Sequence, residues 1–124
     1  MTYRLPLAAL ATTLALALPA AAQDVREGSF VGDSDHETTG TASVVYDMVM
    51  LGADFSLDGA PDPRVALGKQ DSDERLLLGE LAKLEGAQAY SIPEGTTIEE
   101  WDRVWIWCEQ FSVPLGHADL PTAE

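Results

Sequence analysis

The 124-residue chain is poor in the residues that most enzyme sites need, with one cysteine, two histidines and seven basic side chains. A single cysteine excludes an internal disulfide, and the absence of a C-x-x-C motif excludes a dithiol oxidoreductase. The sequence also lacks a zinc cluster, a Gly-rich phosphate loop and a Ser-His-Asp set. A stand-alone enzyme is therefore not favoured.

Basic residues are outnumbered by 21 acidic ones, so the net charge is −14. Such a surface repels the phosphates of nucleic acids and of anionic lipid headgroups, which argues against both as partners. An acidic surface usually serves solubility. A basic redox partner or a metal cation remains an alternative.

Long apolar runs are absent except at the N-terminus. There Arg4 precedes the apolar stretch 5–18, and Ala20-Ala21-Ala22 forms an A-x-A cleavage site. This pattern predicts a secretory signal peptide over residues 1–22, and no later stretch approaches the ~18 apolar residues of a spanning helix. We expect an exported protein, periplasmic or secreted, without a membrane span.

Residues 23–124 are expected to form a single domain, because about 100 residues allow one core of ordinary size. Short apolar segments separated by turn residues, with no long helix, predict an all-β fold: a small β-sandwich or a partly closed barrel. One short helical turn is predicted at 96–101 from overlapping T-x-x-E spacings. Pro63 suggests that the strand it precedes lies at a sheet edge. Strands are expected at 28–32, 41–46, 49–57, 64–67, within 76–84, and at 88–92, 104–108, 111–113 and 116–120.

The densest apolar stretch of this domain is Val104–Phe111. With a period of two, Val104, Ile106 and Cys108 lie on one face of a strand, and Trp105 and Trp107 lie on the other. Because both faces are apolar, the strand is expected to be central and buried on both sides, with Cys108 at its end.

Cys108 has two interpretations. A free cysteine is often a small buried hydrophobe. In an exported, oxidising compartment, an unpaired thiol can instead form an intermolecular disulfide, a sulfenic acid or a metal ligand.

His36 lies in a polar segment, 33–40, that reads as a loop or strand entry. Asp33 and Asp35 resemble the start of a calcium loop, but the later ligands do not follow. Met48 and Met50 are expected to be packing residues rather than haem or copper ligands, and His117 is expected at the surface or in packing. Ligand spacing supports neither a haem nor a metal site, so the cofactor stays open.

Several motifs resemble those of the DM-thirteen (DM13) domain, an "electron-transfer" domain often found beside DOMON domains, over about residues 28–120. The I-W-C-x-x-F core is the most specific of them. The motifs are Gly28-Ser29-Phe30, His36-x-x-x-Gly40, Pro61-Asp62 with Val65-Ala66-Leu67, Leu84-Glu85-Gly86 to Tyr90-x-Ile92-Pro93, Val104-x-Ile106-Trp107-Cys108-x-x-Phe111-x-Val113, and Gly116-x-Ala118-x-Leu120.

The resemblance implies a β-sandwich-like domain of exported or cell-surface proteins in which the motif cysteine, here Cys108, is redox active. His36 stands at the motif histidine and is the second candidate site residue. The chain departs from the family pattern at Ala60-Pro61-Asp62-Pro63 and at Ala66, where an aromatic residue is common.

Two hypotheses follow. In the first, Cys108 is a redox centre that exchanges with a thiol of a partner protein, cycles through a sulfenic acid, or helps His36 to hold a metal or haem. A neighbouring His36 imidazolium would favour the reactive thiolate, whereas Glu109 would oppose it. In the second, the chain is a non-catalytic binding or scaffold module of the cell envelope. Cys108 is then a core residue, and only exposed Trp105 or Trp107 would mark a ligand surface.

Overall fold

The computed structural model describes residues 25–122, and the predicted signal peptide lies outside them. Within these residues the fold is all-β, as expected, with one short 3-10 turn, η2 (Ile98–Glu100). Thr97 precedes this turn but makes no capping hydrogen bond with its side chain, so the turn forms where it was predicted without the predicted capping box. The strands are β1 (Val25–Gly32), β2 (Thr38–Thr39), β3 (Thr41–Val45), β4 (Met48–Leu51), β5 (Ser56–Leu57), β6 (Pro63–Gly68), β7 (Arg75–Glu80), β8 (Gln88–Ser91), β9 (Arg103–Cys108) and β10 (Val113–Asp119).

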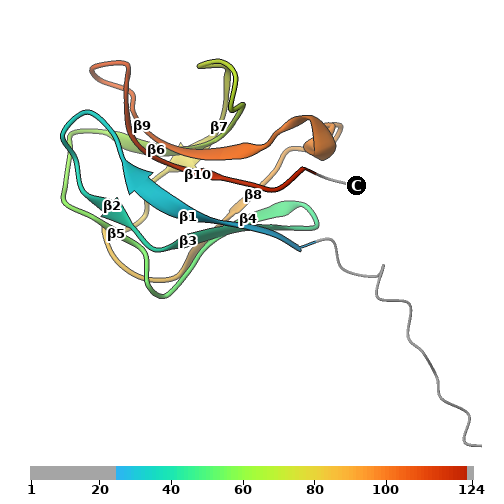
Figure 1. Cartoon of the computed structure of the whole chain (residues 1–124), viewed down its shortest axis with the longest axis horizontal. Coiled ribbons are helices and arrows are strands. Elements are labelled where there is room, and N and C mark those ends of the chain that lie inside the picture. The colour runs from blue at the N-terminus through green and yellow to red at the C-terminus, as the bar shows by residue number, and fades with distance from the viewer. Residues whose placement is uncertain (1–24, 123–124) are drawn as a thin grey trace, which may run out of the picture.

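Eight strands form one antiparallel sheet in the order β7-β6-β9-β10-β1-β3-β4-β8, and β2 and β5 form a separate pair. Strand β1 joins the two halves of the sheet, because its first residues pair with β3 and Phe30 to Gly32 pair with β10. The sheet curls until its two edge strands, β7 and β8, approach each other (Figure 1). The result is a nearly closed barrel.

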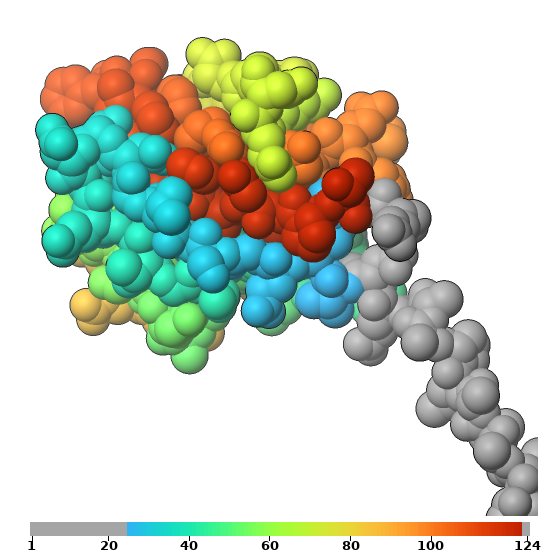
Figure 2. Space-filling view, in the orientation of Figure 1, coloured from blue at the N-terminus to red at the C-terminus, as the bar shows by residue number. Residues whose placement is uncertain are grey.

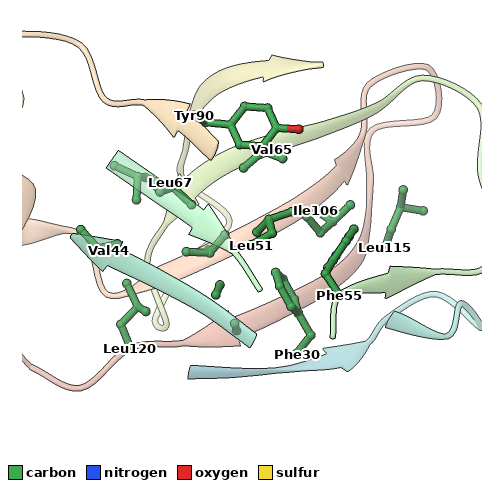
Figure 3. Close-up of a cluster of buried hydrophobic side chains, with 14 of the residues drawn as sticks. Phe30, Val44, Leu51, Phe55, Val65, Leu67, Tyr90, Ile106, Leu115 and Leu120 are labelled. Carbon is green, nitrogen blue, oxygen red and sulfur yellow. The ribbon is translucent and has the colours of Figure 1, made fainter. Parts of the chain in front are cut away.

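Apolar side chains fill the barrel (Figure 3). Phe30 and Phe55 meet edge to face, with ring centroids 5.3 Å apart, near the middle of the core. Val65, Leu67 and Ile106 come from the opposite wall and are fully buried. The interior of the barrel is therefore a packed core.

Arg26 closes one end of this core. Its side chain is only 6% exposed. The guanidinium donates hydrogen bonds to the carbonyl oxygens of Pro121 and Trp101, at 2.8 and 2.7 Å. Burial lowers the pKa of the Arg26 guanidinium, and the nearby carboxylates of Asp102 and Glu99 oppose that shift.

Three sequence-based expectations about strands were wrong. The separate strands expected at 111–113 and 116–120 are one strand, β10, and residues 111 and 112 lie in the turn before it. The strand expected over 49–57 is divided into β4 and β5 by a turn, in which Asp54 accepts hydrogen bonds from the backbone and hydroxyl of Thr41. The β6 strand does not lie at an edge, since it pairs with β7 and β9. Pro63 is tolerated there because it occupies the first position of the strand.

Candidate functional site

The β9 strand carries the predicted alternation. Val104, Ile106 and Cys108 point into the barrel core, whereas Trp105 and Trp107 form a second buried cluster with Ala66 on the outer face of the sheet. The strand lies between β6 and β10. The expectation of a central strand buried on both faces, ending at Cys108, is confirmed.

Cys108 is 1% exposed. Its neighbours across the sheet are Pro63 on β6 and Val113 on β10. Its Sγ donates a hydrogen bond to the carbonyl oxygen of Pro61, 3.1 Å away. The thiol therefore lies beneath the loop that leads into β6, at the end of the barrel where the β9–β10 turn begins.

The two segments that flank Cys108 have left-handed backbone at residues other than glycine. Asp62, in the loop before β6, has φ 50°, and Ser112, in the β9–β10 turn, has φ 51°. The Glu109 N–H donates to the Asp62 carbonyl oxygen and ties the turn to the loop. Beyond this contact, Phe111 is 62% exposed at the tip of the turn.

His36 binds the first residue of the loop that leads into β6. Its Nδ1 is 2.9 Å from Oδ1 of Asp58, and Oδ2 of that carboxylate accepts a hydrogen bond from the Glu37 N–H. The pKa of Asp58 is lowered, first by the Glu37 bond and then by the His36 bond. Asp58 begins the segment 58–62, in which the Pro61 carbonyl oxygen accepts the hydrogen bond from Cys108.

Within the described residues, no hydrogen bond joins His36 to Cys108; His36 is bound to Asp58 and Cys108 to Pro61. The structure therefore brings both candidate residues to segment 58–62 without pairing them. Sequence spacing gave no signal for the contacts of Asp58 with His36 and of Pro61 with Cys108, because these contacts join residues 22 and 47 positions apart.

The two tryptophans of β9 are not exposed platforms. Trp105 and Trp107 are 6% and 4% exposed. The guanidinium of Arg75 lies 3.7 Å over the Trp107 ring centroid, and that of Arg103 lies 4.7 Å over Trp105. The ligand surface that exposed indoles would have provided is covered by arginine side chains.

Two of the remaining candidates have structural partners, but Met50, which was expected to be a packing residue, is 45% exposed. His117 binds Asp33 through Nδ1, at 2.7 Å, and packs edge-on against Trp105. Met48 accepts a long hydrogen bond from Ser91. Across residues 25–122, no three acidic, histidine or cysteine side chains gather to hold a metal ion.

No helix in the described part of the chain is long and apolar enough to cross a membrane. Neither the curated proteins nor the solved structures give a match to the chain. A family model does match it, over residues 29–120, and its description is Electron transfer DM13. This span includes every strand from β2 to β10 and both candidate residues, so the chain belongs to the Electron transfer DM13 family.

Proposed function

We propose that the protein is an exported electron-transfer domain whose redox group is the Cys108 thiol. Membership of an electron-transfer family supports the class of activity. The observation that carries the assignment to Cys108 is its position beneath segment 58–62. The thiol is held by one hydrogen bond to a loop carbonyl at the end of the barrel, so displacing this segment would uncover it.

The step that fits a single thiol is exchange with a disulfide of a partner protein. The Cys108 thiol loses its proton to solvent once the loop has moved, and the thiolate attacks one sulfur of the disulfide. The Cys108 sulfur is oxidised as the mixed disulfide forms, and the second partner sulfur leaves as a reduced thiolate. A small-molecule thiol then attacks the Cys108 sulfur of the mixed disulfide and releases the first partner sulfur as a thiolate, so that the partner disulfide is fully reduced. A second small-molecule thiol frees the Cys108 thiolate and leaves as a small-molecule disulfide, because the chain has no second cysteine.

His36 acts in this proposal as a positioning residue. It holds Asp58, and Asp58 in turn binds the backbone of Glu37, so the start of the covering segment is attached to the loop before β2. Loss of this attachment would favour the open form of the loop, in which the thiol is accessible.

The test is the rate at which Cys108 of the folded protein forms a mixed disulfide with oxidised glutathione, followed by mass spectrometry. We expect the rate of mixed-disulfide formation to depend less on denaturant concentration than the rate of global unfolding does, because the thiol reacts through local opening. The rate should rise severalfold in His36→Ala. The matched control is His117→Ala, which removes the other His–Asp pair but leaves segment 58–62 attached.

Reaction only through global unfolding, unchanged by His36→Ala, would make Cys108 a core residue and contradict the redox proposal. Unfolding free energies of both variants, measured in urea, separate local opening from general destabilisation.

Export is part of the same proposal, and it is supported by the basic start, the apolar run and the A-x-A site at residues 20–22. When the full chain is expressed in a bacterial host, we expect periplasmic or secreted protein that begins at Gln23. Unprocessed protein that remains in the cytosol would contradict export.

A further inference from the structure

A cleft of about 560 Å³ lies beside the loop that covers Cys108. Its floor is the β2–β5 pair, which is extended by the chain at 84–85 through a bridge between Ser56 and Glu85 and a hydrogen bond from Leu57 N–H to the Leu84 carbonyl oxygen. The strands β2 and β5 lie together at one end of the molecule (Figure 1). The lining residues are Glu37, Thr39, Ser56, Leu57, Asp58, Leu84 and Glu85.

The cleft combines apolar and acidic groups. Leu84, which is 45% exposed, and the buried Leu57 both line the cleft and give it an apolar wall. Glu37 and Glu85 are exposed and make no ion pair within residues 25–122, whereas Asp58 binds His36. The side chain of Lys83, the nearest lysine in sequence, lies against Gly86 rather than in the lining.

A lysine or arginine side chain matches this combination. Its aliphatic stem can cover Leu84 and Leu57, and its charged end can reach the carboxylates of Glu37 and Glu85. The net charge of −14 would steer a basic protein toward this surface. An anionic ligand would be repelled by the carboxylates of Glu37 and Glu85. A purely apolar ligand would remove water from these carboxylates without giving them a partner.

We propose that this cleft seats a basic side chain of the protein's redox partner, which is a basic protein. The inference rests on the proposed electron-transfer function and adds the chemistry of the partner. Asp58 lies both in the lining of the cleft and at the start of segment 58–62. A partner seated there would therefore contact the loop that covers Cys108. Figure 2 shows the β9–β10 turn beside the segment around residues 33–40 at this end of the molecule.

The test is an NMR titration of the ¹⁵N-labelled protein with an amidated Lys-Leu-Lys-Leu peptide, with Glu-Leu-Glu-Leu as the control probe. We expect saturable shift changes concentrated at 37–39, 56–58 and 84–86 with the basic peptide only. The double variant Glu37→Gln/Glu85→Gln should raise the Kd of the basic peptide by about fivefold to tenfold, because it removes two exposed ionic contacts.

The control variant Asp71→Asn/Asp73→Asn makes the same change in charge in the turn between β6 and β7, and should leave the affinity within about twofold. Leu84→Ser should also weaken binding, because it removes the apolar wall. Shift changes spread over the whole acidic surface, or equal weakening in both double variants, would overturn the proposal in favour of unspecific charge attraction.

Repeating the titration with Cys108→Ser distinguishes this inference from the redox proposal. Binding should be retained, because the cleft does not include Cys108. An inert Cys108 with specific peptide binding would contradict the redox role alone, and reactive Cys108 without peptide binding would contradict the cleft alone.

Discussion

At the scale of single residues, the absence of a side chain at position 68 makes room for Trp105. A Cβ atom at Gly68 would collide with Nε1 and Cδ1 of the indole ring. The ring cannot move away easily, because Arg103 covers it and His117 packs against its edge. Gly68 and Ala66 are the small residues of β6 that leave room for the tryptophans of β9 on the outer face of the sheet.

Gly68→Ala should therefore destabilise the protein by about 1–3 kcal/mol through overpacking. Gly79→Ala on the neighbouring strand β7 is the matched control, since its Cβ would meet Tyr90 at an ordinary 3.6 Å. We expect the control to change the unfolding free energy by less than about 1 kcal/mol. Urea unfolding followed by tryptophan fluorescence measures both, and equal stabilities would contradict the packing of Trp105 on Gly68.

The Asp58 carboxylate gives a prediction about how the stability of the protein changes at low pH. Its pKa is lowered from the ordinary 3.8 by the Glu37 N–H and then by His36, so the ionised carboxylate stabilises the folded state. This contribution is complete above the unfolded-state pKa and is lost as the pH falls through the lower folded-state pKa. Asp58→Asn should lower the thermal unfolding midpoint at pH 7.

The difference between wild type and Asp58→Asn should shrink below about pH 4 and vanish once the wild-type carboxyl is protonated. Thermal scans from pH 7 to pH 2 measure it. Asp71→Asn is the control, because the side chain of Asp71 is exposed and makes no hydrogen bond or ion pair within residues 25–122. A difference that is independent of pH would contradict the role of the Asp58 charge.

At the scale of elements, the seam between β7 and β8 is where the barrel is not closed by a ladder of hydrogen bonds. Side chains hold it instead. Tyr90 on β8 lies against Gly79 on β7. Its hydroxyl accepts a hydrogen bond from the Ala82 N–H, at 2.9 Å, and donates one to Gln88, at 2.6 Å.

Tyr90→Phe should cost about 1 kcal/mol, because it removes these bonds but leaves Gln88 to accept from Ala82 at 3.1 Å. Tyr90→Ala should cost about 3–5 kcal/mol, since it also leaves a cavity in the core. Hydrogen exchange at residues 80–92 should rise most in the alanine variant. A Tyr90→Phe protein as stable as wild type would show that packing alone closes the seam.

At the scale of the whole molecule, charge is the dominant feature. The ion pairs Arg64–Asp62, Lys69–Glu74 and Arg103–Asp119 use three of the basic side chains, and most carboxylates within residues 25–122 have no ion-pair partner. Because these carboxylates repel one another, the folded state is destabilised by its own charge at low ionic strength.

Salt should therefore stabilise the protein. Raising NaCl from about 10 mM to about 1 M shortens the screening length from about 30 to 3 Å. We expect the thermal midpoint at pH 7 to rise by several degrees, and to rise less in Asp71→Asn/Asp73→Asn, which starts with less repulsion. A midpoint that falls with salt would mean that the ion pairs outweigh the repulsion.

Sequence alone determined the features that depend on neighbouring residues. The alternation at Val104–Cys108 separated the core face from the tryptophan face, because side chains of a strand point to opposite sides with a period of two. The many short segments identified an all-β fold, and the I-W-C-x-x-F motif identified the family.

Tertiary structure alone decided what surrounds each candidate side chain. The attachment of His36 to Asp58, the Pro61 carbonyl over Cys108 and the arginines over the tryptophans all join residues far apart in the chain. The same holds for the interior position of β6 and the seam at Tyr90. Periodicity specifies which face of a strand is buried, but not which strand lies beside it or which loop covers its end, because those contacts arise only when the sheet closes.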